Sequence, residues 1–153
     1  MKTKIISTLS ILLIFTSCLF MPSKKVSDIF IKAGYEEKIK NAFLVLDKII
    51  ILKDFKEDEV RKNAEYIFQL ITSKHNQQIS NPTHRLYAVI TIKEDSFIKE
   101  FVSLNTVSIE TQLVDKDTDE IILQMVLSEE SPNTITSYSY LYEIMETSLK
   151  TIF

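Results

Sequence analysis

Cys18 is the only cysteine of this 153-residue chain, and it stands at the end of an apolar run close to the amino terminus. The run has the parts of an export signal: Lys2 and Lys4 at its start, about ten mostly apolar residues as far as Phe15, and two small residues before the cysteine. A transmembrane helix needs roughly 20 apolar residues, so this run is too short to span a bilayer. A lone cysteine forms no internal disulfide and no thiolate zinc site, so neither role explains its position at the end of an apolar run.

The residues Phe15-Thr16-Ser17-Cys18 resemble the bacterial lipobox, in which an apolar residue and two small ones precede an invariant cysteine. Phe15 stands where leucine is usual. The resemblance implies that a peptidase removes residues 1–17, that the Cys18 thiol carries a diacylglycerol, and that the freed amine can take a third acyl chain. Two or more chains anchor a protein stably, because each buried CH₂ adds about 0.8 kcal/mol. An ordinary cleaved secretory signal and an uncleaved anchor are the alternatives.

The remaining chain has the size and charge of one small, acidic domain. Removing residues 1–17 would leave 136 residues with 16 basic and 21 acidic side chains, enough for one hydrophobic core. This net negative charge argues against nucleic acid as a partner. The single glycine, Gly34, excludes glycine-rich phosphate-binding loops. We predict a signal peptide over 1–17, a lipidated amino terminus and tether over 18–34, and a single periplasmic domain over 35–153.

Metal and catalytic sites are not predicted. The acidic stretch 115–119 has the spacing of a calcium loop, but Glu120 and Val126 stand where such a loop needs glycine and glutamate, so a hairpin turn is favoured. His75 and His84 are the only histidines, and without further cysteines they make a poor zinc set. No nucleophile-elbow motif is present. We therefore expect no catalytic residue, no cofactor and no enzyme activity.

Three tyrosines at alternating positions, Tyr138, Tyr140 and Tyr142, suggest one partner contact. Tyr138 and Tyr142 share the apolar face of a predicted helix, so we expect them in the core. Tyr140 points elsewhere and is a candidate exposed anchor, since tyrosine is enriched at interface hot spots. The alternative is that Tyr140 is also structural.

A second candidate contact is the apolar cluster of Phe97, Ile98 and Phe101. It lies around the predicted connection between two strands, where contiguous apolar residues are unusual. Exposed apolar patches of this kind mark interaction sites.

Hydrophobic spacing predicts the elements that position these residues. Apolar residues at helical spacing indicate an amphipathic helix over 56–74, and a short helix from about Glu36 is expected to enter a strand near 48–53. Alternating residues predict strands over 84–94, 101–114 and 121–127, joined as an antiparallel meander in which the third strand is more central. Ser131-Pro132 is expected to open the final helix, with serine as its cap. Asp54 and Glu57 resemble a capping box for the amphipathic helix.

This order predicts an α+β fold, with a small antiparallel meander of three to four strands packed against two or three helices and a helical carboxyl terminus. The text SIETQLVDKDTDEIILQMVLSEE resembles the strand, Asp-x-x-Thr-Gly turn and returning strand of the curli-secretion and penicillin-binding-protein-activator lipoproteins. Asp115 and Thr118 match, and Asp119 replaces the glycine. The resemblance covers roughly residues 84–152 and implies a periplasmic accessory domain to which no catalytic residue carries over. Lipopolysaccharide-assembly lipoproteins have a comparable layout.

The predicted function is that of a membrane-anchored bacterial lipoprotein acting as a non-enzymatic accessory or binding module of the cell envelope. Its partners would be the membrane, through lipid on Cys18, and an envelope protein. It would lie on the cell membrane or outer membrane, facing the periplasm. The alternatives are a carrier that holds a lipid or another apolar ligand between helices and sheet, and a lipoprotein exposed at the cell surface.

Overall fold

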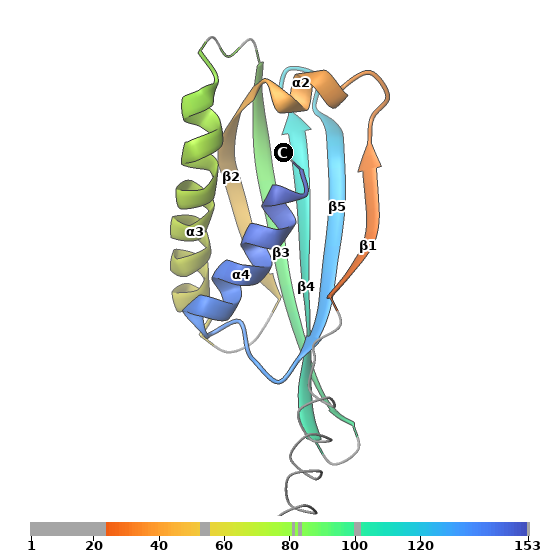
Figure 1. Ribbon diagram of the computed structural model, residues 1–153, viewed down its shortest axis with the longest axis vertical. Helices are drawn as coiled ribbons and strands as arrows, with labels where there is room; N and C mark the ends of the chain where they lie inside the picture. The colour runs from red at the N-terminus through yellow and green to blue at the C-terminus, as the bar shows by residue number, and fades with distance from the viewer. Residues whose placement is uncertain (1–23, 53–55, 81, 83, 100–101, 153) are drawn as a thin grey trace, which may run out of the picture.

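A five-stranded sheet with helices over one face forms the part of the chain that the computed structural model describes, residues 24–52, 56–80, 82, 84–99 and 102–152 (Figure 1). The strands lie in the order β1-β5-β4-β3-β2. The predicted α+β class and helical carboxyl terminus are confirmed, with five strands in place of three to four. The elements are β1 Lys24–Ile31, α2 Glu36–Lys40, β2 Ala42–Leu52, α3 Glu57–Gln78, β3 His84–Lys99, β4 Val102–Asp115, β5 Glu120–Ser131 and α4 Tyr138–Lys150.

The strands β3, β4 and β5 form the predicted antiparallel meander, and β5 is an interior strand with neighbours on both sides. The sheet as a whole is mixed, because β2 runs parallel to β3 and α3 makes the crossover between them. At the other side, β1 pairs antiparallel with β5. The sequence assigned β1 to the tether, and it predicted only the second half of β2 as strand.

In β2, the strand starts at Ala42, directly after the five-residue α2, and not near Lys48. Helical and strand spacing overlap in this apolar segment, and pairing with β3 decides for the strand. A shift in register between Leu46 and Lys48 leaves Asp47 exposed and brings Ile49 and Ile51 to the core. This bulge explains why the apolar pattern of the segment does not alternate regularly.

Residues 24–31, assigned above to the tether, form β1 in the sheet. Their pairing runs from Lys24 opposite Glu129 to Ile31 opposite Leu123. The folded domain therefore begins before residue 35, and residues 19–23 lie between Cys18 and Lys24, the first residue of β1. A strand needs a neighbour, which here lies about a hundred residues away in the sequence, so local pattern could not reveal it.

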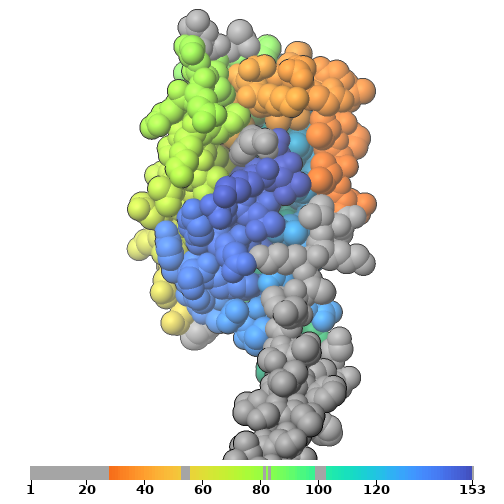
Figure 2. All heavy atoms as spheres, viewed as in Figure 1, coloured from red at the N-terminus to blue at the C-terminus, as the bar shows by residue number. Residues whose placement is uncertain are grey.

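The helices α3 and α4 cover the same face of the sheet, and Figure 2 shows the side chains of α4 over its middle. The predicted apolar face of α3 is confirmed, with Val60, Ala64, Ile67 and Phe68 buried. In contrast, α4 begins at Tyr138, and not at Ser131-Pro132. Ser131 instead ends β5, and its side chain is buried.

The predicted capping box of α3 is wrong, because the helix begins at Glu57 with Lys56 as its N-cap, whereas the box would need Glu57 as the third residue of the helix. Asp54 itself lies outside the described residues. Lys56 precedes the first turn in a left-handed conformation, with φ of 59°. None of the helices in the described part of the chain is both long enough and apolar enough to cross a membrane.

Candidate functional site

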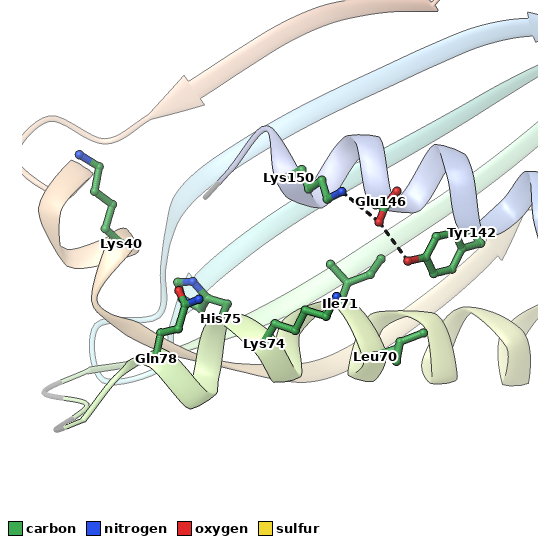
Figure 3. Close-up of a pocket in the computed structure, with 9 residues that line it drawn as sticks. All are labelled: Lys40, Leu70, Ile71, Lys74, His75, Gln78, Tyr142, Glu146 and Lys150. Carbon is green, nitrogen blue, oxygen red and sulfur yellow. Dashed lines mark hydrogen bonds and ion pairs between the residues drawn. The ribbon is translucent and has the colours of Figure 1, made fainter.

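A groove of about 440 Å³ lies between α3 and α4, with Lys40 of α2 at one end (Figure 3). Its floor includes Leu70 and Ile71 of α3 and the ring of Tyr142 of α4. Each of the three helices contributes a lysine to its rim: Lys40, Lys74 and Lys150. The groove thus combines an apolar floor with cationic groups, a combination that suits an anionic ligand with an apolar part.

On the α4 side, a four-residue spacing stacks Tyr142, Glu146 and Lys150 along one helix face. The Tyr142 hydroxyl donates to Glu146 Oε1 over 3.0 Å, and Lys150 Nζ lies 3.1 Å from the same oxygen. The hydrogen bond from Lys150, followed by that from Tyr142, lowers the pKa of the Glu146 carboxyl. The hydrogen bond to Glu146 in turn raises the pKa of Tyr142. Glu146 is therefore held ionised, which makes it a poor proton donor at neutral pH.

On the α3 side, His75 is committed to the backbone of β2. Its Nε2 lies 3.1 Å from the carbonyl oxygen of Ala42, which can only accept a hydrogen bond, so Nε2 carries the hydrogen. His84 stands elsewhere, exposed at the start of β3. No group of three or more metal-ligating side chains occurs within the described ranges.

A protruding hairpin end is the second feature of interest. The register aligns Lys24, Glu129, Val107 and Glu94 in one row across β1, β5, β4 and β3. From this row β3 and β4 continue together as far as the pair Lys99 and Val102, past the start of β1 (Figure 1). The predicted connection after residue 94 is thus regular paired strand.

The apolar cluster predicted for partner contact lies at this hairpin end. Ile98 is 79% exposed and Phe97 is half-buried. Phe97 pairs with Leu104 across the hairpin. Phe101 lies outside the described residues, so the structure places only part of the predicted cluster.

Polar contacts join the base of the hairpin to the loop before α4. Glu94 is buried and accepts hydrogen bonds from the Ile135 amide and the Thr134 hydroxyl, both over 3.2 Å. Asn105 Nδ2 donates to the carbonyl oxygen of Asn133 over 2.9 Å. Glu94 was not among the residues predicted to be functional, although Glu94 continues the alternation of inward residues along β3. These contacts hold the hairpin in one direction relative to the sheet.

The prediction that Tyr140 is an exposed anchor is wrong, and the alternative that it is structural is confirmed. Of the two tyrosines expected in the core, Tyr142 packs against it and Tyr138 is exposed. Tyr140 is buried, with 5% of its surface exposed, whereas Tyr138 is 42% exposed and Tyr142 is half-buried. The buried stripe of α4 runs through Leu141 and Ile144, and Tyr140 lies beside it. Burial raises the pKa of the Tyr140 hydroxyl to about 12, and the negative charge of Glu129 adds to the shift. Tyr140 therefore belongs to the core and is not an exposed anchor.

The acidic stretch forms the expected turn between β4 and β5. The amide of Asp117 donates to Asp115 Oδ1 over 3.0 Å. Asp119 adopts a left-handed conformation with φ of 56°. Aspartate tolerates this conformation better than most residues.

Cys18, the predicted lipidation site, lies outside the described residues. No protein-family model matches the chain, and no curated protein matches it. Among solved structures, the chain is similar to a variant PelC dodecamer from Paraburkholderia phytofirmans, with 11% identity and a TM-score of 0.46, over 86% of this chain and 97% of the other. A PelC dodecamer in another crystal form gives 9% identity, a TM-score of 0.46 and the same coverage. Likeness at this level supports no conclusion about assembly or function.

Proposed function

We propose that the chain is a lipid-anchored, non-enzymatic accessory module of the bacterial cell envelope. The observation that carries this proposal is the sequence Phe15-Thr16-Ser17-Cys18 behind a short basic and apolar run. The start of β1 at Lys24 supports it, since the body then follows the modified residue after a short connection. Lipid on Cys18 would hold the sheet and its helices at the membrane surface.

Metabolic labelling with palmitate, followed by membrane fractionation, tests the anchor. Wild-type protein should carry label and sediment with membranes, whereas Cys18→Ala should lose both because it lacks the thiol that is acylated. Ser17→Ala keeps a small residue before Cys18 and serves as the matched control. Label on the Cys18→Ala protein, or unlabelled wild-type protein in the soluble fraction, would refute the proposal.

The outer edge of β1 is the surface that best suits an envelope protein partner. Ile29, Phe30 and Ile31 are all exposed there, and β1 has a strand neighbour on one side only within the described residues. An added strand could pair with such an edge and seat its side chains on these apolar residues. A photo-crosslinking amino acid at Phe30 should capture a partner in intact envelopes, whereas one at the exposed Gln77 of α3 should not. Equal capture at the two positions, or none at Phe30, would exclude this edge.

A second candidate function is the binding of an anionic amphiphile in the groove between α3 and α4. Its apolar floor and the lysines of its rim favour this function, and two of these lysines, Lys40 and Lys150, also form ion pairs with Glu37 and Glu146. The groove is open at the surface, unlike the site between helices and sheet expected for a carrier. A fluorescent long-chain fatty acid should bind wild-type protein, and Lys74→Glu should weaken binding because it reverses one rim charge. Lys62→Glu, at an exposed position of α3 outside the groove, should leave binding unchanged. Equal binding by the two variants would rule the groove out.

Exposure at the cell surface remains a further proposal for location. Protease added to intact cells would remove a surface-exposed domain and spare one that faces the periplasm. As a control, protease added to lysed cells should cut the protein, which shows that the protein is cleavable once the protease can reach it.

A further inference from the structure

The end of the β3–β4 hairpin also has a position relative to the expected anchor that gives it a role of its own. We infer that Phe97, Ile98 and Leu104 rest in the interface of the lipid bilayer that holds Cys18, as a second membrane contact. The inference depends on the proposed lipidation of Cys18. The surface formed by these three side chains would contact the bilayer itself, and not a protein partner.

The exposure of Ile98 is the first support. At 79%, it is the most exposed large apolar side chain in the described part of the chain. It lies beyond the body of the sheet, on the projecting part of the hairpin, with Phe97 next to it and Leu104 opposite Phe97. Apolar side chains at a projecting tip can enter a bilayer interface without unfolding any element.

Chain direction is the second support. Strand β1 begins at the row of Lys24 and Glu129, and it runs away from the hairpin end. The chain therefore reaches β1 from Cys18 at the same end of the sheet at which the hairpin projects. A lipid on Cys18 would make this the membrane-proximal end of the molecule.

The third support is that residues 18–23 and the projecting part of the hairpin have similar maximum lengths. Residues 18–23 can span at most roughly 20 Å when fully extended. The hairpin continues five residues past the shared row, from Glu94 to Lys99, which corresponds to about 17 Å of strand. The two lengths are similar, so a fully extended connection places the hairpin end near the level of the anchor, and a more contracted one brings it deeper.

The fourth support is that hydrogen bonds at its base hold the β3–β4 hairpin in a fixed direction. The hydrogen bonds of Glu94 and Asn105 join the hairpin base to the 132–137 loop. Ser96 adds a hydrogen bond to Asn105 Oδ1 over 2.7 Å, across the two strands. A projection held in this way keeps its apolar end toward the anchor. Attachment of Cys18 then gives the end a high effective concentration at the bilayer, even if its intrinsic affinity is weak.

Fluorescence quenching in membranes tests the inference. The full-length lipoprotein, purified with its lipid, is reconstituted in vesicles of phosphatidylethanolamine and phosphatidylglycerol that contain brominated phosphatidylcholine. Because the Cys18 thiol is acylated, Ile98→Cys supplies the only free thiol for an environment-sensitive fluorophore. Asp117→Cys, in the exposed turn at the opposite end of the sheet, is the matched control. Both sites are exposed, so neither substitution should disturb the fold.

We expect the probe at position 98 to shift its emission to the blue and to lose most of it to the brominated lipid, while the probe at 117 stays unchanged. Vesicle flotation of the same samples reports the anchor separately. Protein that floats with a solvent-exposed, unquenched probe at 98 would overturn the inference and leave the proposed function standing. A blue shift without quenching would also overturn it, because the probe would then be covered by protein. Protein that does not float would refute the lipid anchor, and the inference with it.

Discussion

At one edge of the sheet, β2 runs beside α3, and side chains of that helix bond to the backbone of the strand. Asn76 accepts from the Leu44 amide over 2.9 Å and donates to its carbonyl oxygen over 3.0 Å. Arg61 donates to the carbonyl oxygen of Ile49 in the same way. At the opposite edge, β1 has no strand on its outer side within the described ranges, and Phe30 is 57% exposed.

The difference shows how one sheet can close one edge and leave the other available. An unpaired strand edge is a template for another chain, and proteins usually block it. In β2 the amide of Asn76 imitates a neighbouring strand, so pairing with a second molecule would first have to displace α3. Within the described residues β1 has no such cover, and it is the first of these strands after Cys18 in the sequence. The open edge is therefore formed by the strand that follows the expected anchor most closely in the sequence.

The largest expected effect is a difference in unfolding free energy between substitutions at the two edges of the sheet. Phe68→Ala removes a buried ring that packs α3 into the core, and it should lower the free energy of unfolding by about 3–5 kcal/mol. Phe30→Ala removes an exposed ring of β1 and should change it by no more than about 0.5 kcal/mol. Chemical denaturation of the two variants measures both values. Similar losses would mean that β1 is covered in solution.

A smaller effect is expected from the backbone contacts of Asn76. Asn76→Ala leaves the Leu44 amide and carbonyl without their side-chain partner and should cost about 1–3 kcal/mol. Ser73→Ala is the control on the same helix, because the Ser73 hydroxyl bonds only to the Leu70 carbonyl oxygen within α3. Denaturation midpoints compare the two. If the variants were equally stable, Asn76 would not be closing the edge of β2.

Self-association tests the open edge. Phe30→Lys should reduce concentration-dependent self-association of the purified chain, since charge on an edge strand opposes edge-to-edge pairing. Its thermal stability should stay close to that of the wild type. Sedimentation velocity over a concentration series provides the measurement, with the lysine substitution of the exposed Gln77 beside β2 as control. An unchanged distribution for Phe30→Lys would show that β1 does not self-pair.

The smallest expected effect is a pH dependence of the stability contributed by Lys32, which follows β1. The Lys32 ammonium forms an ion pair with Glu120, and this hydrogen bond raises the pKa of Lys32 above its ordinary value of 10.5. A raised folded-state pKa stabilises the fold at pH values below 10.5, and the contribution is lost as the pH rises through the higher folded value. Lys32→Met should therefore melt slightly lower than the wild type at pH 7, and the gap should close in strong alkali. A gap independent of pH would assign the effect to packing.

Several parts of the fold could be predicted because their patterns are long and regular. The apolar stripe of α3 and the alternation along β3, β4 and β5 are longer and more regular than the apolar patterns of the connecting loops. The apolar hairpin cluster was also visible in the sequence, and Ile98 is exposed as that interpretation requires. Short apolar runs were ambiguous. β2 follows a five-residue helix and contains a bulge, so neither period dominates there.

The tyrosines show that local spacing is also ambiguous for the burial of single side chains. Their spacing placed Tyr138 and Tyr142 in the core, but α4 begins at Tyr138, and its packing against the sheet buries Tyr140. Where a helix starts and how it is rotated on a sheet depend on residues far away in the chain. For the same reason, Asn76 as the cover of β2 carried no recognisable sequence signal. The alternation along β3 placed Glu94 inward, but it could not identify the hydrogen-bond donors that Glu94 meets.

The sequence by itself determined the α+β class, the meander, the α3 stripe and the prediction that Cys18 carries lipid, because each depends on residues close together in the chain. Only the tertiary structure decided that residues 24–31 belong to the sheet, that α3 closes one edge and that the hairpin projects beside the start of β1. These features need backbone partners or side-chain acceptors from distant segments. Such partners meet only once the chain has folded, so local spacing carries no record of them.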